Sequence, residues 1–198
     1  MRDARKEGNL QFSENTQEEP PKEKESILSF LGELPLLIIT AVVVAWLIKT
    51  VLVQPFFIPS SSMEPTLMPG DRVLVSKFTY RFRSPEPKDV IVFIAPDTQG
   101  GVEQDFIKRV VATAGMSVQV DNGQLLVDGK SSNEKYTHPD SPTSNFGPLT
   151  VPKARVFVMG DNRPNSKDSR IFGPVDKKKI LGKAFMIYWP PDRVGLLR

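Results

Sequence analysis

The pattern of hydrophobic and polar positions divides the chain into three stretches. Residues 1–26 hold 12 charged residues of both signs and almost no apolar ones. Such a stretch buries too little surface to offset the entropy of ordering it, so we expect a disordered tail. Residues 34–53 carry a single charge, Lys49, within 20 positions. As a helix they would be about 30 Å long, the thickness of a bilayer core. We therefore predict a polar tail over residues 1–33 and a transmembrane helix over residues 34–53.

Two other interpretations of residues 34–53 are weighed against this one. A buried core helix is disfavoured because the stretch is apolar on all sides over its whole length. A cleaved signal peptide is disfavoured because the charged leader is long and acidic, although the serines at 60–62 offer a small-x-small pattern. Lys22 and Lys24 closely precede the stretch, while the first basic residue after it is Arg72. This bias favours an N-terminus on the inner side of the membrane.

Beyond the predicted helix the pattern changes to short runs rich in Val, Ile and Phe, which are typical of β-strands. Residues 117–127 indicate a hairpin, because Asn122 and Gly123 readily adopt the positive φ of its tight turn. Residues 129–152 are rich in Ser, Pro and Asn and predict a long exposed loop. We expect residues 54–198 to form a mostly β domain, with strands over residues 72–78, 90–94, 106–112, 155–159 and 183–189.

Composition excludes several kinds of function. The 198-residue chain has a net charge of +3 and no basic stripe with interleaved aromatic residues, so we expect no nucleic-acid partner. The chain contains no cysteine, which excludes disulfides, zinc–thiolate sites and thiol nucleophiles. His138 is the single histidine, and no carboxylates with ligand spacing surround it. We therefore expect no metal site.

A run of three serines, residues 60–62, follows the predicted helix. Pro59 and Pro65 fix the backbone on either side of it. A Ser/Pro stretch is commonly a linker, and that alternative stays open. The interleaved apolar side chains favour instead an apolar cleft that presents a hydroxyl; they are Phe56, Phe57, Ile58, Met63 and Leu67. We therefore treat the serines as candidate nucleophiles.

A serine hydroxyl needs a neighbouring base to act as a nucleophile near neutral pH. His138 lies in a stretch typical of a surface turn, which disfavours it. A lysine can serve if burial lowers its pKa. With strand alternation, Lys108 shares a face with Phe106 and Val110. Lys77 is a similar case in an earlier run, and the pattern alone does not choose between the two lysines.

Residues 160–170 alternate carboxylates, hydroxyls and guanidinium groups. A polar loop with Asx turns is the simpler interpretation. The same density of donors and acceptors also suits a hydrogen-bonded scaffold. Asp168 and Arg170 are two positions apart, so on an extended backbone they would share a face and could pair.

Taken together, these stretches resemble the type I signal peptidases, the membrane-anchored serine proteases that remove signal peptides from exported proteins. The resemblance covers the predicted span and nearly everything after it. The single span and the Arg-Val-Gly-Leu-Leu ending are similar to those of cyanobacterial members. Four motifs occur in the family's order: Ser-x-Ser-Met-x-Pro-Thr-Leu from Ser60, Gly-Asp-Arg-Val from Gly70, Phe-Ile-Lys-Arg-Val-Val from Phe106, and Gly-Asp-Asn-Arg-x-x-Ser-x-Asp-Ser-Arg from Gly160.

The resemblance implies a role for each matching residue. Ser62 corresponds to the nucleophile and Lys108 to the general base, which decides between the two lysines. The Ser62 amide and the Ser60 hydroxyl would form the oxyanion hole. Ser166 matches the serine that orients the lysine. The pair that matches the supporting positions is Asp168 and Arg170.

The resemblance also implies partners and a location. Signal peptides of exported preproteins end in small-x-small, which requires two shallow apolar pockets. The residues expected to line them, unless they are ordinary core, are Ile58, Met63, Leu67 and Ile107. The second partner would be the lipid bilayer of a bacterial plasma or thylakoid membrane, crossed once. The catalytic domain would lie on the extracytoplasmic side and the tail in the cytoplasm. No cofactor and no metal are implied.

Three places depart from the family's pattern. Lys88 stands where Gly is common, Pro164 stands where an acidic residue or Asn is common, and Thr-Ala-Gly-Met at 113–116 replaces Leu-Pro-Gly-Asp. None involves the proposed dyad, so they affect the expected loop geometry rather than the chemistry.

Two rival functions are a self-cleaving Ser-Lys protease of the SOS-repressor type and an inactive membrane-tethered peptide-binding module. The predicted span and the missing DNA-binding helices disfavour the first.

Overall fold

The computed structural model describes residues 34–46, 53–96, 104–138, 141 and 143–197. Residues 34–46 form a helix. Across the described residues, no helix is both long enough and apolar enough to cross a membrane. The predicted polar tail, residues 1–33, lies outside the described residues, and so do residues 47–52 of the predicted span.

The last residue of the predicted span belongs to a strand. Val53 begins β1 (Val53–Phe57), which pairs in antiparallel register with β2 (Arg72–Ser76). The helix predicted to end at residue 53 is therefore wrong at that position, because Val53 lies opposite Ser76 in a sheet. The β structure starts one residue before the predicted boundary.

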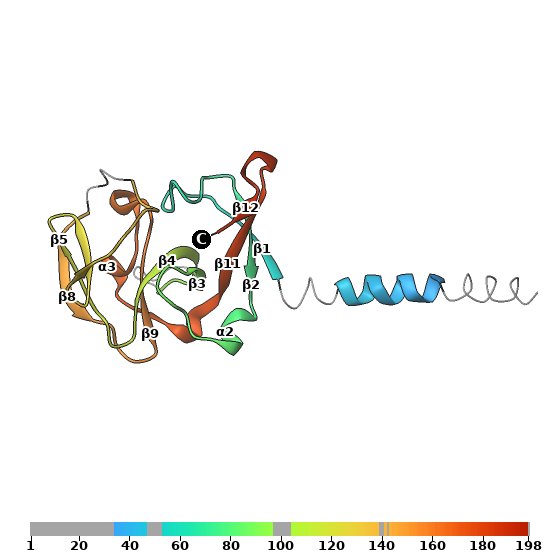
Figure 1. The fold of residues 1–198 in the computed structure, drawn as a ribbon, viewed down its shortest axis with the longest axis horizontal. Helices are drawn as coiled ribbons and strands as arrows, with labels where there is room; N and C mark the ends of the chain where they lie inside the picture. Colours follow the sequence, from blue (N-terminus) through green and yellow to red (C-terminus); the bar gives the residue numbers. More distant parts are fainter. Residues whose placement is uncertain (1–33, 47–52, 97–103, 139–140, 142, 198) are drawn as a thin grey trace, which may run out of the picture. The chain divides into compact units, whose positions relative to one another are not determined.

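The described residues of the β domain form two antiparallel sheets. The larger has eight strands in the order β1-β2-β11-β3-β4-β9-β10, with β12 paired to β11 (Figure 1). Besides β1 and β2 its strands are β3 (Val90–Ile94), β4 (Asp105–Thr113), β9 (Arg155–Met159), β10 (Val175–Asp176), β11 (Ile180–Trp189) and β12 (Gly195–Leu196). β4 lies between β3 and β9, so neighbouring strands hold it on both sides.

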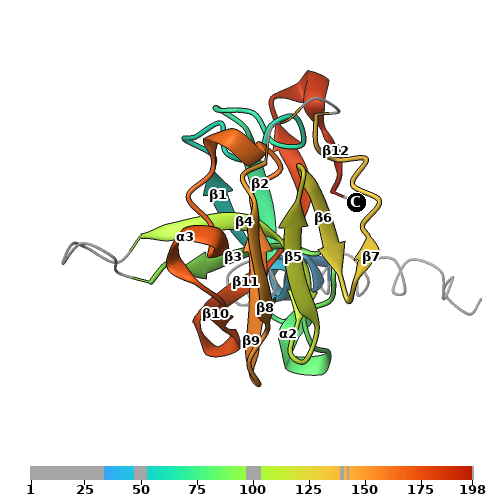
Figure 2. The ribbon, with the colours of Figure 1, turned by 90° about the vertical axis from the view of Figure 1, so that its left-hand side faces the viewer.

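The smaller sheet has four strands in the order β7-β6-β5-β8, and Figure 2 shows β5, β6 and β7 side by side. These strands are β5 (Ser117–Asp121), β6 (Gln124–Val127), β7 (Lys130–Ser131) and β8 (Phe146–Thr150). The predicted hairpin is confirmed by the pairing of β5 with β6. Asn122 and Gly123 at its turn have φ of 48° and 79°, as a tight hairpin turn requires.

The long exposed loop predicted over residues 129–152 is wrong in part. β7 and β8 both lie inside this range, and Val151 is only 1% exposed. Phe146 and Leu149 of β8 pack on the buried cluster beside β5. The sequence pattern did not predict β8, because Gly147 and Pro148 interrupt its apolar positions. Both residue types are rare in strands.

The other predicted strands are confirmed, with small differences at their ends. β3 and β9 match the predicted ranges, whereas β2 ends at Ser76, before Lys77. β11 begins three residues before the predicted start at 183. Short helices that the pattern did not predict are α2 (Thr79–Phe82), η1 (Arg163–Asn165), α3 (Ser169–Phe172), η2 (Lys177–Lys179) and η3 (Pro191–Arg193).

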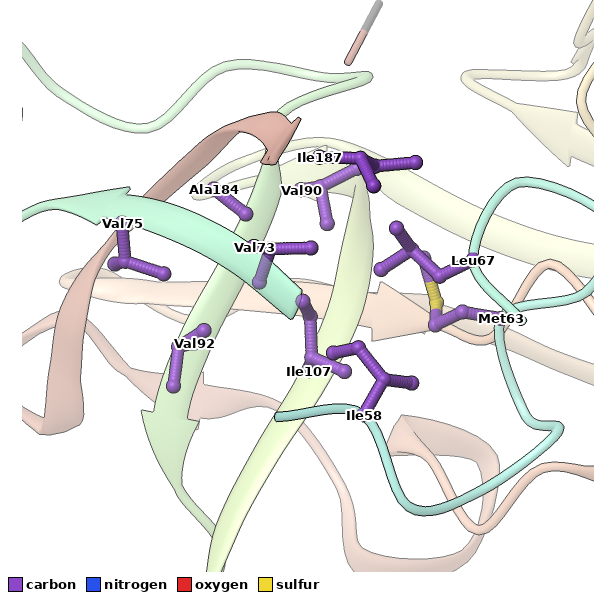
Figure 3. Packing of buried hydrophobic residues seen from close by; sticks show 10 residues of the cluster. All are labelled: Ile58, Met63, Leu67, Val73, Val75, Val90, Val92, Ile107, Ala184 and Ile187. Atoms are coloured by element: carbon purple, nitrogen blue, oxygen red, sulfur yellow. The ribbon is translucent and has the colours of Figure 1, made fainter. Parts of the chain in front are cut away.

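One buried cluster lies directly beneath the serine run. Figure 3 shows Met63 and Leu67 side by side, facing side chains from the strands of the larger sheet. Burying a side chain of this size contributes roughly 1.5–3 kcal/mol, so these two residues anchor the loop that carries the serines. The cluster consists of Ile58, Met63, Leu67, Val73, Val75, Val90, Val92, Ile107, Ala184 and Ile187.

Candidate active site

The serine run sits in the loop between β1 and β2, and backbone hydrogen bonds close that loop. The Ile58 amide donates to the Asp71 carbonyl at 2.9 Å, and the Gly70 amide donates to the Ile58 carbonyl at 2.8 Å. Inside the loop, the Leu67 amide donates to the Met63 carbonyl at 2.9 Å. Closed ends and buried anchors give the loop one conformation, and in it the Ser62 side chain is 8% exposed.

Lys108 comes from β4, an inner strand of the larger sheet, and its side chain meets Ser62. Its Nζ lies 2.7 Å from Ser62 Oγ and 2.8 Å from the carbonyl oxygen of Ile107. The same ammonium lies 5.3 Å from the centre of the Phe106 ring. A separation of 2.7 Å is within direct proton-transfer reach of the hydroxyl. The two residues that the sequence singled out, 46 positions apart, are therefore brought together.

Burial lowers the pKa of Lys108. The residue is 4% exposed, and removal from water disfavours its charged form, which brings the pKa from 10.5 down to about 8. The carboxylates of Asp168 and Asp161 act in the opposite direction and limit the shift. A lysine with this pKa has a substantial neutral fraction in mildly alkaline solution, so it can accept a proton.

Ser60 places a second hydroxyl next to the first. Its Oγ lies 3.3 Å from Ser62 Oγ, while the residue itself is exposed at the mouth of the site. A hydroxyl at this position can donate to a group that reacts with Ser62. The oxyanion role implied by the resemblance thus has a donor within reach.

A polar loop after β9 holds the serine loop from the side. The Asn162 amide donates to the Ser62 carbonyl at 3.1 Å, and Asn162 Nδ2 donates to the Ser61 carbonyl at the same distance. Asn165 Nδ2 donates to Ser61 Oγ at 2.7 Å. Neither asparagine was expected to position the serine loop. The repeated Asn in a dense polar stretch is the one signal that could have found them.

Gly160 lets this loop approach the serine closely. A Cβ at position 160 would lie 2.4 Å from the Ser62 carbonyl oxygen and 2.3 Å from Ser166 Oγ, so a larger residue would force the two loops apart. The same distances place Ser166 beside the backbone of Ser62. In the part of the chain that the structure describes, the buried Ser166 Oγ has no hydrogen-bond partner. Lys108 bonds to Ser62 and Ile107, and not to Ser166 as the resemblance implies.

The expected pairing of Asp168 with Arg170 is confirmed. Arg170 donates two hydrogen bonds of 2.8 Å to the Asp168 carboxylate. Asp168 also accepts from the Gly160 amide at 3.0 Å. The pair therefore fixes the polar loop at Gly160, where that loop touches the serine.

A second buried ion pair was not foreseen. Arg109 donates to Asp161 through Nε at 2.9 Å and through a terminal nitrogen at 2.7 Å. Thr66 Oγ1 also donates to the Asp161 carboxylate, at 2.5 Å. The Arg109 guanidinium stacks on the Tyr136 ring, with the guanidinium carbon 4.1 Å from the ring centre. Arg109 follows Lys108 in β4, so this network fixes the strand that carries the lysine.

An apolar cavity of about 360 Å³ opens beside the Ser62–Lys108 pair. Ile58 and Ile107 line it, as expected. Met63 and Leu67 do not, and that expectation is wrong: both have no exposed surface, because they pack inside the buried cluster that Figure 3 shows. The lining residues are Phe56, Phe57, Ile58, Pro59, Ser60, Ser62, Val92, Gln104, Asp105, Phe106, Ile107, Lys108, Asn165 and Lys167.

The remaining sequence candidates lie away from the cavity. Lys77 and His138 are exposed, and neither lines it. Lys88, a departure from the family's pattern, has φ of 80°, a backbone conformation that favours glycine. Within the described ranges, no three His, Asp or Glu side chains gather in a way that could hold a metal ion.

Comparison with known proteins identifies the family. A family model described as "Signal peptidase, peptidase S26" matches residues 31–189. The probable signal peptidase I-2 of Synechocystis sp. is 41% identical over 189 residues, covering 94% of this chain and 86% of that protein. Signal peptidase I of Mycobacterium tuberculosis is 36% identical over 251 aligned positions, covering 99% of this chain and 83% of that protein. Thylakoidal processing peptidase 1 of Arabidopsis thaliana is 41% identical over 163 residues, covering 79% of this chain and 48% of that protein. The chain belongs to the signal peptidase family of serine peptidases, peptidase S26.

Proposed function

We propose that this member of the family cleaves signal peptides from exported preproteins, with Ser62 as nucleophile and Lys108 as general base. One observation carries the residue assignment: Lys108 Nζ lies 2.7 Å from Ser62 Oγ, and burial lowers the pKa of that lysine to about 8. Hydrogen-bond contact and a lowered pKa are the two properties that a general base needs.

The reaction is an acyl transfer. Neutral Lys108 takes the proton of Ser62 as Oγ attacks the scissile carbonyl, and the tetrahedral intermediate carries a negative oxygen. The Ser62 amide and the Ser60 hydroxyl stabilise that oxygen, each by roughly 3 kcal/mol. The Lys108 ammonium then protonates the leaving amine, which leaves an ester on Ser62. Neutral Lys108 next takes a proton from water as the water oxygen attacks the ester carbonyl. The Lys108 ammonium then returns that proton to Ser62 Oγ, which leaves as the free hydroxyl when the acid is released, and neutral Lys108 is restored.

The cavity suits the small side chains of a signal-peptide cleavage site. Its apolar lining next to the dyad includes Ile58, Ile107 and Val92. An apolar lining disfavours charged side chains, because burying them without a partner costs free energy. Together with membership of the signal peptidase family, it supports a substrate with small residues at the cleavage site, in the small-x-small pattern.

The membrane anchor and its topology belong to the same proposal. The stretch from residue 34 to the start of β1 would cross a bilayer once, with the tail over residues 1–33 in the cytoplasm and the β domain on the opposite side. The apolar length of the stretch supports this, and a relative in Arabidopsis is named a thylakoidal processing peptidase. Protease added outside spheroplasts should digest the β domain. Digestion confined to the polar tail would mean the reverse orientation.

The direct test of the activity is the Ser62→Ala variant, purified in detergent and incubated with a preprotein. It should fold and release no mature product, because the hydroxyl that attacks is missing. Ser84→Ala, a change at an exposed serine outside the cavity, is the matched control and should process normally. Product formation by Ser62→Ala at the wild-type rate would assign the nucleophile to Ser60 or Ser61. Absence of cleavage by the wild type would favour the inactive peptide-binding module.

A further inference from the structure

Two charged side chains line the catalytic cavity without serving the dyad. Lys167 and Asp105 both border the cavity, and both residues are exposed. Within the described part of the chain neither forms an ion pair, whereas the guanidinium groups around the site, Arg109, Arg163 and Arg170, all pair with carboxylates. The charges of Lys167 and Asp105 are therefore available to a bound molecule.

The two charges occupy different places along the cavity. Lys167 and Ser62 line the same cavity, and Lys167 directly follows Ser166, whose Oγ lies beside the Ser62 backbone, so we place the Lys167 charge at the serine's end of the cavity. Asp105 precedes Lys108 by three residues on β4, which corresponds to about 10 Å of extended strand. An extended peptide that follows the cavity would therefore meet a positive charge near the catalytic serine and a negative charge about three residues away.

We propose that Lys167 is a specificity-determining residue that selects substrates with an acidic side chain close to the scissile bond. The inference rests on the proposed function and adds a charge preference to it. An exposed ammonium attracts the carboxylate of a bound peptide electrostatically, and this attraction needs no further residue of the protein. Asp105 limits the preference to one part of the substrate, because its carboxylate repels an acidic side chain that lies in the part of the cavity lined by Asp105.

The size of the effect follows from the exposure of Lys167. Ion pairs in contact with solvent are weak, so the preference for an acidic residue should be roughly two- to fivefold in kcat/KM. Salt screens such pairs, and the preference should shrink as the ionic strength rises. A preference that survives molar salt would come from packing instead of charge.

The test uses the full chain in detergent and a set of peptides with one small-x-small site. Each peptide carries one Glu, placed in turn at each position from four before the scissile bond to four after it except the two small positions of the site, and is compared with the same peptide carrying Gln. The readout is the ratio of kcat/KM for the two peptides, which cancels changes that affect all substrates alike. The variants are Lys167→Gln and Lys167→Glu. Lys77→Glu makes the same charge change on an exposed lysine outside the cavity and is the control.

We expect a wild-type ratio above one at one or more positions next to the scissile bond. Lys167→Gln should bring that ratio to one, Lys167→Glu should bring it below one, and Lys77→Glu should leave it as in the wild type. Equal ratios in wild type and both Lys167 variants would overturn the inference, since Lys167 would then be only a solvated side chain. If that result comes with cleavage that Ser62→Ala abolishes, only this inference fails. If the peptides are not cleaved, or Ser62→Ala cleaves them equally well, the proposed function fails with it.

Discussion

Arg109 and Asp161, 52 positions apart in the chain, form a two-point ion pair with no solvent-exposed surface on Asp161 and 1% on the Arg109 side chain. Lys108 precedes Arg109 and Gly160 precedes Asp161, so the pair joins the strand of the proposed base to the loop that touches the proposed nucleophile. The pair therefore ties together the two segments that flank the Ser62–Lys108 contact.

Removing one partner of the pair should therefore destabilise the protein strongly. Arg109→Met leaves the Asp161 carboxylate buried without its guanidinium, and breaking a buried pair in this way costs about 3–5 kcal/mol. Chemical denaturation of the β domain would measure the loss. Arg72→Met, at an exposed arginine of β2, is the control and should change the free energy of unfolding by no more than about 0.5 kcal/mol. An equal effect of the two substitutions would contradict the role given to the pair.

Lys88→Gly should stabilise the protein. Lys88 has φ of 80°, and a non-glycine residue in that region costs about 1–2 kcal/mol. Glycine loses more entropy on folding, so the net gain should be up to about 1 kcal/mol. The Lys88 carbonyl keeps its hydrogen bond from Arg109, since the backbone is unchanged. Lys77→Gly, at a lysine without positive φ, should instead lower stability, and thermal melts of the two variants would decide.

Ser60→Ala should slow the chemical step with little effect on substrate binding. The hydroxyl lies 3.3 Å from Ser62 Oγ and would meet a negative charge that exists only in the transition state. Loss of one such donor lowers kcat by about 100- to 1,000-fold, while KM should change little. Steady-state kinetics on one peptide would separate the two constants. A raised KM with an unchanged kcat would place Ser60 in substrate binding.

Lys108→Met should raise stability while abolishing activity. At pH 7 the lysine is protonated in both the folded and the unfolded chain, and its folded pKa of about 8 lies below the ordinary 10.5. Keeping the ammonium buried therefore lowers the free energy of unfolding by roughly 3 kcal/mol at pH 7. That cost is fully present below pH 8 and is relieved as the pH rises toward 10.5. The stability difference between variant and wild type, followed by denaturation at several pH values, should shrink over this range. A constant difference would mean that Lys108 keeps an ordinary pKa.

The sequence predicted the local features of the site well. Strand alternation placed Lys108 on one face with Phe106, and the Lys108 ammonium does lie over that ring. The pairing of Asp168 with Arg170 is confirmed, but not on the extended backbone that was expected, since Asp168 caps α3 and Arg170 lies in that helix. Residue chemistry alone left Lys77 and Lys108 equivalent. The structure separates them by burial, since β2 ends at Ser76 and leaves Lys77 exposed, whereas neighbouring strands flank β4 on both sides.

Features that depend on contacts between distant segments were not predictable. The partner of Arg109 lies in a loop after another strand, and no local pattern identifies it. Met63 and Leu67 were assigned to the substrate pockets because they flank the nucleophile in sequence. A turn of the loop directs both into the core instead, where their burial holds Ser62 in place.

The pH dependence of peptide cleavage tests the Ser62–Lys108 dyad most directly. Lys108 must be neutral to accept a proton, so kcat/KM should rise with pH through an apparent pKa of about 8. Lys108→Arg should be nearly as inactive as Lys108→Ala over the whole range, because a guanidinium stays protonated. Lys77→Ala should retain the wild-type profile. An active Lys108→Arg enzyme, or a wild-type rate that does not change between pH 6 and pH 10, would contradict a lysine base.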